Sequence, residues 1–254
     1  MQRFAVHLVT AVDFPHEHNF IHTDIKPHNI FVKFRLRSRI EPYLAEVPVP
    51  QQDSAQERYT PVKSTPFRRY YFSEADHTRV AEFQVALGDW GVSSSATQHL
   101  TERIQPVALR ASEVLIEAPW DKSVEWWNLG ALLLEFYRAV RMFDGRVPPD
   151  GRYDVKEHVA EIVSLFGPLP KDLLDPGNQH LVRSIFDDQG RPKDCPPMDG
   201  PSLASEDVLP GEARDLFASF LSFVMKINPA ERPSAEQMLT HPWIGMVLKP
   251  KTNG

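Results

Sequence analysis

The most constraining feature of this sequence is a short polar loop between an apolar pair at 20–21 and a β-branched, apolar run at 30–32. Because such runs favour strands, we expect the loop to be held at both ends. The loop carries the carboxylate of Asp24, the amine of Lys26 and the amide of Asn29. Phosphoryl transfer uses this set: a carboxylate that accepts a hydroxyl proton, a cation on the moving phosphoryl group, and an amide oxygen on Mg²⁺. Taken alone, the stretch could also be a plain polar turn.

The His-x-Asp-x-x-x-x-Asn spacing of this loop, at 22–29, resembles the catalytic loop of protein kinases. Four further motifs follow the loop in chain order. The Gly-Asp-Trp-Gly within 86–91 resembles their metal-binding Asp-Phe-Gly, and Ala-Ser-Glu within 110–113 resembles their Ala-Pro-Glu. The segment 123–130 resembles the start of the central helix of the large lobe, and 228–234 resembles the C-terminal region of that lobe. Five motifs in family order identify the chain as similar to protein kinases.

The resemblance implies a fold class as well as a family. We expect a mainly α structure with a small β ribbon: a kinase-like C-terminal lobe over residues 1–254, with the N-terminal lobe absent and a loop or spacer-like insertion at 34–83. Within the family, the chain most resembles SR-protein kinases and their fungal relatives. The sequence His-Thr-Asp-Ile-Lys-Pro at 22–27, the insertion, and the segment 105–110 carry this likeness.

The family resemblance also implies roles for four residues. Asp24 is similar to the catalytic base, and Lys26 is similar to the residue that neutralises the transferred phosphoryl group of ATP. Asn29 and Asp89 resemble the two Mg²⁺ ligands, and Mg²⁺ takes such oxygens alongside phosphates. The implied cofactors are therefore ATP and Mg²⁺, and the implied activity is that of a Ser/Thr kinase.

Besides Trp90, which stands in place of the Phe of Asp-Phe-Gly, four positions depart from the family pattern. By resemblance, residues 92–120 form the activation segment. Thr23 replaces the Arg that usually receives a phosphate of this segment, so we expect no phosphate-dependent activation. Glu125 replaces an Asp that holds the catalytic-loop backbone, and its longer side chain shifts the geometry. Pro106 replaces a Thr whose hydroxyl bridges the catalytic Asp and Lys, and Pro offers neither a hydroxyl nor an N–H. Ser112 replaces the Pro of Ala-Pro-Glu.

Other family positions are expected to be structural. By resemblance, Glu113 and Arg232 form a buried ion pair that ties the activation segment to the last helices. His22 and Trp90 are interpreted as packing residues rather than proton carriers. The remaining histidines show no ligand spacing.

The amino-acid composition limits the kinds of partner and compartment that fit this chain. The formal net charge of −6 argues against general nucleic-acid binding and favours a basic protein partner. The resemblance to SR-protein kinases implies that this partner is a protein substrate with serines in a basic, Arg/Ser-rich segment. The single Cys195 excludes an internal disulfide and fits a reducing compartment, cytoplasmic or nuclear. No apolar run approaches the ~18 residues of a membrane span.

The stretch before the catalytic loop is too short for a kinase small lobe. No Gly-x-Gly-x-x-Gly occurs, and the first lysine is Lys26. For this chain alone we therefore expect millimolar Mg·ATP affinity and no peptide phosphorylation. Two alternatives stay open: a non-catalytic kinase-like lobe that acts as a protein-binding module, or a kinase whose sequence has been cut at Met1.

Hydrophobic periodicity predicts the remaining elements. Val80 to Leu87 is expected to be a strand, 168–210 receives no assignment, and Ser234 to Gln237 fits a capping box. The predicted helices lie at 1–19, 121–140, 152–167, 211–226 and 234–240.

Overall fold

The computed structural model describes residues 1–33, 40–47, 84–147, 151–194, 203, 205 and 214–248. Contacts divide the chain into one unit of Met1–Phe31 with Ala86–Gly254, and a second of Val32–Val85. In the second unit, α2 (Ile40–Glu46) is helical where the sequence predicted a loop. Pro42 is tolerated there because it lies in the first turn, whose N–H groups have no partner within the helix. The rest of the 34–83 insertion lies outside the described residues, as does the first part of the strand expected from Val80.

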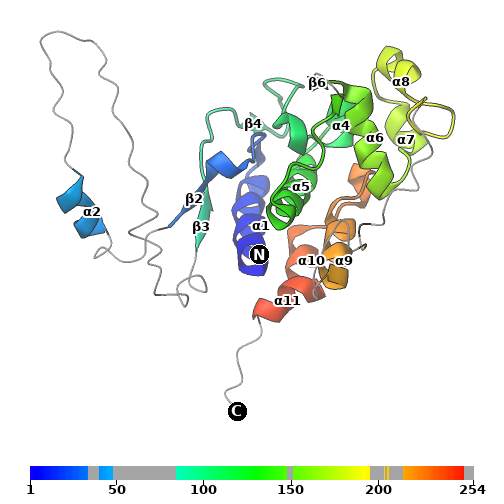
Figure 1. Ribbon diagram of the computed structural model, residues 1–254. Helices are drawn as coiled ribbons and strands as arrows, with labels where there is room; N and C mark the ends of the chain where they lie inside the picture. Colours follow the sequence, from blue (N-terminus) through cyan, green and yellow to red (C-terminus); the bar gives the residue numbers. More distant parts are fainter. Residues whose placement is uncertain are drawn as a thin grey trace, which may run out of the picture. The chain divides into compact units, whose positions relative to one another are not determined.

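The first unit is built mainly from helices, which Figure 1 labels in chain order. Their bounds are α1 (Gln2–Glu17), α4 (Ser112–Leu115), α5 (Val124–Arg138), α6 (Val155–Phe166), α7 (Lys171–Leu174), α8 (Gln179–Ile185), α9 (Arg214–Val224), α10 (Ala235–Thr240) and α11 (Pro242–Leu248), with 3₁₀ turns η1 (Pro27–Asn29), η4 (Val107–Leu109) and η5 (Pro229–Glu231). This composition confirms the mainly α fold class.

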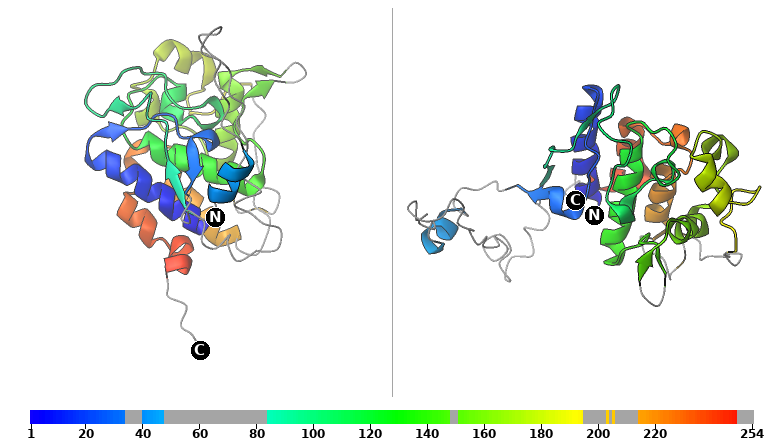
Figure 2. Two further views of the ribbon diagram at one scale, coloured as in Figure 1. Left: turned by 90° about the vertical axis from the view of Figure 1, so that its left-hand side faces the viewer. Right: turned by 90° about the horizontal axis from the view of Figure 1, so that it is seen from above.

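The core of the unit forms around α5. Every residue of α5 from Val124 to Leu134 is buried, as expected for a helix that is apolar nearly all round. The predicted stripe of α1 packs inward through Leu8, Val9 and Val12. Figures 1 and 2 show α1 beside α5, with α9, α10 and α11 next to this pair.

Short antiparallel ribbons hold the loops against this core. Strand β1 (Phe20–Ile21) pairs with β4 (Ser94–Ser95), and β5 (Arg146–Val147) pairs with β6 (Arg152–Tyr153). Strand β2 (Ile30–Val32) pairs with β3 (Val85–Leu87). The polar loop at 22–29 is therefore held between strands at both ends, as the sequence predicted.

In the connection left unassigned at 168–210, the described part, which is continuous to residue 194, forms the short helices α7 and α8. Asn178 caps α8, since its side chain accepts hydrogen bonds from the backbone N–H groups of His180 and Leu181. The capping box predicted at α10 is confirmed: the Ser234 and Gln237 side chains bond each other's backbone N–H groups. Among the described residues, no helix is long and apolar enough to cross a membrane.

A buried ion pair joins α4 to the turn after η5. The Arg232 guanidinium contacts both carboxylate oxygens of Glu113, with 2.8 Å between Nη2 and Oε2, and both side chains are fully buried. Arg232 also donates to the carbonyls of Lys226 and Ser123 and lies 5.6 Å from the ring centre of Trp127. The predicted pairing of Glu113 with Arg232 is confirmed.

We expect Glu113→Ala or Arg232→Ala to lower the free energy of unfolding by about 3–5 kcal/mol, because each leaves one buried charge uncompensated. Urea denaturation measures this change. The exposed pair Arg214–Asp215 supplies a control, since Asp215→Ala should cost less than about 1 kcal/mol. Wild-type stability in both buried-pair variants would contradict the structural role of the pair.

Helix α6 carries two titratable side chains, Glu161 and His158, whose pKa values are shifted by burial. Burial raises the pKa of the Glu161 carboxyl to about 7, although the Gly145 N–H donates to it at 3.1 Å. Burial also lowers the pKa of His158 to about 3, with a smaller effect from the Arg110 charge. Both groups are therefore held closer to their neutral forms in the folded protein.

Glu161 is expected to weaken the fold as pH rises. A carboxyl with a raised folded pKa contributes its stability below its unfolded pKa, near 4.5, and loses it as pH rises through about 7. Glu161→Gln keeps an oxygen acceptor for the Gly145 N–H and does not ionise. We expect it to leave stability unchanged near pH 4.5 and to raise it by about 1 kcal/mol at pH 8, a value discounted for the half-exposed side chain. Parallel pH-dependent melts that never diverge would contradict this assignment.

Candidate active site

Thr23 is the strained residue of the loop that follows β1. Its φ of 67° is a left-handed conformation that β-branched residues rarely adopt. Three hydrogen bonds hold it: its N–H donates to Glu125 Oε1 at 2.8 Å, its hydroxyl donates to the Val92 carbonyl at 2.8 Å, and its carbonyl accepts from the Gln105 N–H at 2.9 Å. Three separate segments thus fix the backbone of Thr23. They thereby set the direction of the side chain of the next residue, Asp24.

Glu125 is the group that connects this loop to the core. It lies in the first turn of α5 and is fully buried. Its Oε1 accepts from Thr23, and its Oε2 lies 2.7 Å from Nε2 of His16 at the end of α1. The expected role in holding the catalytic-loop backbone therefore fits Glu125 with its longer side chain.

Sequence reasoning missed His16. A signal existed, because position 16 continues the apolar face of α1 one turn beyond Val12, so a polar side chain there must find a buried partner. The edge of the Trp126 ring also packs on His16, with 5.0 Å between ring centres.

The predicted catalytic side chains lie together. Lys26 Nζ is 2.6 Å from Asp24 Oδ2, and Asn29 Nδ2 donates to the same Oδ2 at 3.0 Å and to the Asp24 carbonyl at 2.9 Å. Asn29 is buried, whereas the Asp24 and Lys26 side chains stay 22% and 35% exposed. The Asp24 carboxylate is thus oriented by two donors and remains open to an incoming group.

Asp89 approaches this cluster through the backbone. It follows β3, and the N–H of the preceding Gly88 donates to the Asn29 carbonyl at 2.9 Å. Asp89 has a left-handed φ of 61° and an exposed side chain. Asn29 and Gly88, the residue before Asp89, are therefore in direct contact.

His22 links the two halves of the site. Its Nδ1 accepts from the Asp24 N–H at 3.2 Å, so its proton lies on Nε2, which donates to the Gly88 carbonyl at 2.8 Å. The ring is buried and meets the edge of Trp90 at 4.5 Å between centres. This geometry agrees with the structural roles expected for His22 and Trp90.

The donor set fits a hard cation. The amide nitrogen of Asn29 is used on Asp24, which leaves Oδ1 as its acceptor. Asp89 adds an exposed carboxylate one residue after Gly88, whose N–H donates to the Asn29 carbonyl. Mg²⁺ binds such oxygens together with waters and phosphates rather than in all-protein cages. Among the described residues, no group of three His, Cys, Asp or Glu side chains could hold a metal.

The activation segment reaches the catalytic loop through Gln105. This residue has a φ of 68°, and its side chain bonds the Val124 carbonyl and the Ala111 N–H. Its N–H donates to the Thr23 carbonyl, while Pro106, the residue before η4, has no N–H to donate. The backbone of Gln105 therefore ties the segments together beside the position where the sequence lacks a hydroxyl.

Comparison with known proteins shows the family and the fold to which this chain is similar. The family model described as "Protein kinase domain" matches residues 73–244. The kinase domain titled PF14_0431 has a similar fold, with a TM-score of 0.62 and 19% identity over 96% of this chain and 64% of that one.

The similar proteins show which types of kinase are related to this chain. A serine/threonine protein kinase of Aspergillus fumigatus is 32% identical over 93% of this chain and 56% of its own length. The serine/threonine-protein kinase SRPK of Physarum polycephalum is 24% identical over 94% of this chain and 59% of its own. The chain belongs to the protein kinase family, and its relatives include serine/threonine and SR-protein-kinase types. It spans less than two thirds of the length of these two relatives.

Glu125 contacts both His16 and Thr23. We therefore expect that Asp, the usual residue of the family at this position, would destabilise this chain. Glu125→Asp shortens the side chain by one CH₂, so its carboxylate cannot reach both partners, and a buried donor is left unpaired. We expect a loss of about 1–3 kcal/mol in the free energy of unfolding. Thermal or urea melts of Glu125→Asp beside Glu157→Asp, a non-buried carboxylate on α6, test this. Equal stability of the two variants would show that the length of residue 125 does not matter.

Proposed function

We propose that this chain provides the catalytic lobe of a serine/threonine protein kinase that transfers the γ-phosphate of ATP to a protein hydroxyl. The observation that carries the proposal is the Asp24 carboxylate, held by Lys26 Nζ and Asn29 Nδ2 on a loop fixed at Thr23. Such positioning and charge stabilisation account for most of the catalysis of phosphoryl transfer.

In this proposal each residue has one task. Asp24 orients the substrate hydroxyl and receives its proton as the new oxygen–phosphorus bond forms and the bond to the β-phosphate oxygen breaks. Lys26 balances negative charge next to Asp24, while Asn29 and Asp89 would hold Mg²⁺. When bound, Mg²⁺ neutralises phosphate charge.

The finer part of the proposal concerns the substrate. The similarity to a kinase named SRPK and the net charge of −6 support a basic, Arg/Ser-rich protein segment as acceptor. A cytoplasmic or nuclear location belongs to the same proposal, because the single cysteine fits a reducing compartment.

One observation favours a second candidate, a non-catalytic kinase-like lobe that binds proteins. Pro106, which follows the Gln105 that bonds Thr23, provides neither a hydroxyl nor an N–H. The same lobe could then act by binding a partner without transferring phosphate.

Phosphoryl transfer by the full-length gene product decides between the candidates. We expect phosphorylation of an Arg/Ser-rich peptide, with less on a peptide in which glutamine replaces arginine. Asp24→Asn should lower the turnover number by about 10²–10⁴, the usual loss of a general base. Asp188→Asn, an exposed change of the same chemistry, should leave it unaltered.

Equal turnover in wild type and Asp24→Asn would contradict the assigned base. If the wild-type protein transfers no phosphate but binds the peptide, the binding-module candidate is supported instead.

A further inference from the structure

The carboxylate of Asp89 lies on a short turn, residues 89–92, between β3 and β4. The turn is closed by the Ser93 N–H, which donates to the Trp90 carbonyl at 3.1 Å. A β-carbon placed on Gly91 would lie 3.5 Å from Asp89 Oδ1, so the carboxylate lies beside the backbone of its own turn. The place of the carboxylate therefore depends on what holds this turn.

The first end of the turn is held by two residues of the catalytic loop. The Gly88 N–H donates to the Asn29 carbonyl at 2.9 Å, and Nε2 of His22 donates to the Gly88 carbonyl at 2.8 Å. The Trp90 ring also packs on the ring of His22. The chain is thus fixed where it enters the turn.

The far end of the turn is held by a side chain, the hydroxyl of Thr23, which donates to the Val92 carbonyl at 2.8 Å. The register of β1 and β4 pairs Ile21 with Ser94, so a continued ladder would place Thr23 opposite Val92. The Ala96 N–H donates to the Asn19 carbonyl, and bonded pairs recur at every second residue of an antiparallel ladder. A continued ladder would therefore use the Thr23 N–H as the donor to Val92.

That N–H is not available, because the left-handed backbone of Thr23 directs it to Glu125 Oε1 instead. The hydroxyl of Thr23 takes its place on the Val92 carbonyl. Thr23 is 3% exposed, so its side chain is enclosed where it makes this bond. A residue without a β-hydroxyl could bond Glu125 through its backbone but would leave Val92 unattached to the catalytic loop.

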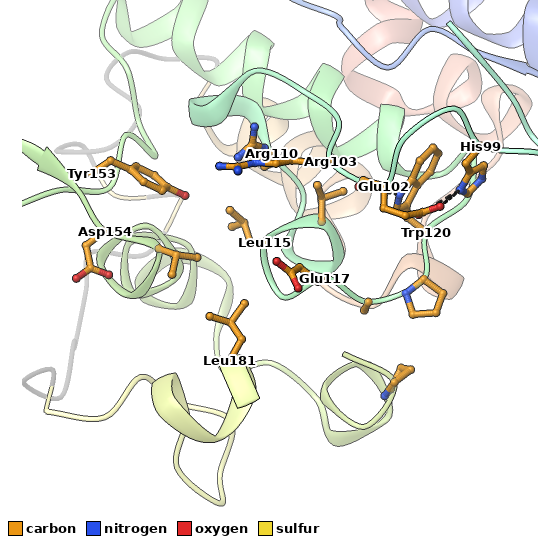
Figure 3. Close-up of a pocket in the computed structure, with 15 residues that line it drawn as sticks. His99, Glu102, Arg103, Arg110, Leu115, Glu117, Trp120, Tyr153, Asp154 and Leu181 are labelled. Atoms are coloured by element: carbon orange, nitrogen blue, oxygen red, sulfur yellow. Dashed lines mark hydrogen bonds and ion pairs between the residues drawn. The ribbon is translucent and has the colours of Figure 1, made fainter. Parts of the chain in front are cut away.

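The later part of the activation segment has anchors of its own, which Figure 3 shows on the wall of a cavity of about 1020 Å³. Nε1 of Trp120 donates to the Glu102 carbonyl at 3.2 Å, and the Trp120 ring stacks on His99 with 3.7 Å between centres. Nε of Arg110 donates to the Ile104 carbonyl at 3.0 Å. Loss of the Thr23 hydroxyl should therefore act on the turn at 89–92 and leave the segment beyond β4 in place.

We propose that the Thr23 hydroxyl is a positioning group for the Asp89 carboxylate. By holding the Val92 carbonyl it fixes the turn at 89–92, and with the turn the oxygens that Asp89 offers to a divalent cation. The hydroxyl acts through the turn and touches neither the cation nor the substrate. This rests on the proposed function, in which Asn29 and Asp89 would hold Mg²⁺.

Binding of Mn²⁺ to the full-length gene product with ADP tests the role, with free Mn²⁺ measured by electron paramagnetic resonance and ADP alone as the blank. Mn²⁺ accepts the same oxygen ligands as Mg²⁺. Thr23→Val keeps the branched shape and removes the hydroxyl. We expect it to weaken Mn²⁺ binding about tenfold, the usual loss when a group that orients a metal ligand is removed. Thr23→Ser keeps the hydroxyl and should bind as wild type does, as should Thr97→Val, an exposed change on the same segment.

Amide hydrogen exchange gives a second measurement, without metal or nucleotide. The Ser93 N–H closes the turn, so its exchange should be faster in Thr23→Val than in wild type. The Ala96 N–H, which is bonded to Asn19, should exchange at the wild-type rate. If Thr23→Val does not fold, Thr23→Ala removes the same hydroxyl without a branched side chain on a left-handed backbone, and the same results are expected of it.

Several results would overturn the proposal: wild-type Mn²⁺ affinity in Thr23→Val, Thr23→Ser as weak as Thr23→Val, unchanged exchange of the Ser93 N–H, or no Mn²⁺ binding by the wild-type protein. Neither measurement involves ATP, a phosphate acceptor or turnover. If phosphoryl transfer fails while Mn²⁺ binding still depends on the hydroxyl, the proposed function is removed and the positioning role of Thr23 stands.

Discussion

The fully buried carboxylate of Glu125 is the interaction on which the candidate site depends. It receives a hydrogen bond from the Thr23 backbone with one oxygen and contacts His16 with the other. Helix α1, helix α5 and the catalytic loop therefore meet at a single charged group inside the core. Removing a charge or partner from such a group is costly, because water cannot replace the lost contact.

This constraint explains how a strained loop can place reactive groups accurately. Thr23 adopts a left-handed backbone that it would not choose alone, and its bonds to Glu125, Val92 and Gln105 compensate for the strain. Asp24 follows directly and is oriented by Lys26 and Asn29. The activation segment is attached at the same point, because the Gln105 N–H donates to the Thr23 carbonyl.

Sequence reasoning succeeded where short-range patterns determine the structure. The apolar spacing of α1 and α5, the capping box at Ser234 and the polar loop between strands all depend on neighbouring residues. The Glu113–Arg232 pair was predicted from family motifs rather than from local pattern.

The missed features depend on partners distant in the chain, or on short elements. His16 gained its role only when α1 packed against α5, more than 100 residues away in the chain. Helices α2, α7 and α8 have four to seven residues, too few to show a helical period, and end caps such as Asn178 decide them. The roles of Asp24, Lys26, Asn29 and Asp89 stay predictions, although the geometry brings the first three into direct contact.

Native-state hydrogen exchange at the Thr23 amide tests the central claim most directly. If Glu125 holds this N–H inside the core, its exchange should require global unfolding and should match that of the Val9 amide in the middle of α1. An N–H in an exposed loop would exchange orders of magnitude faster. Protection of Thr23 equal to that of Val9 is the result we predict, and rapid exchange of Thr23 in a folded protein with a protected Val9 would contradict the account.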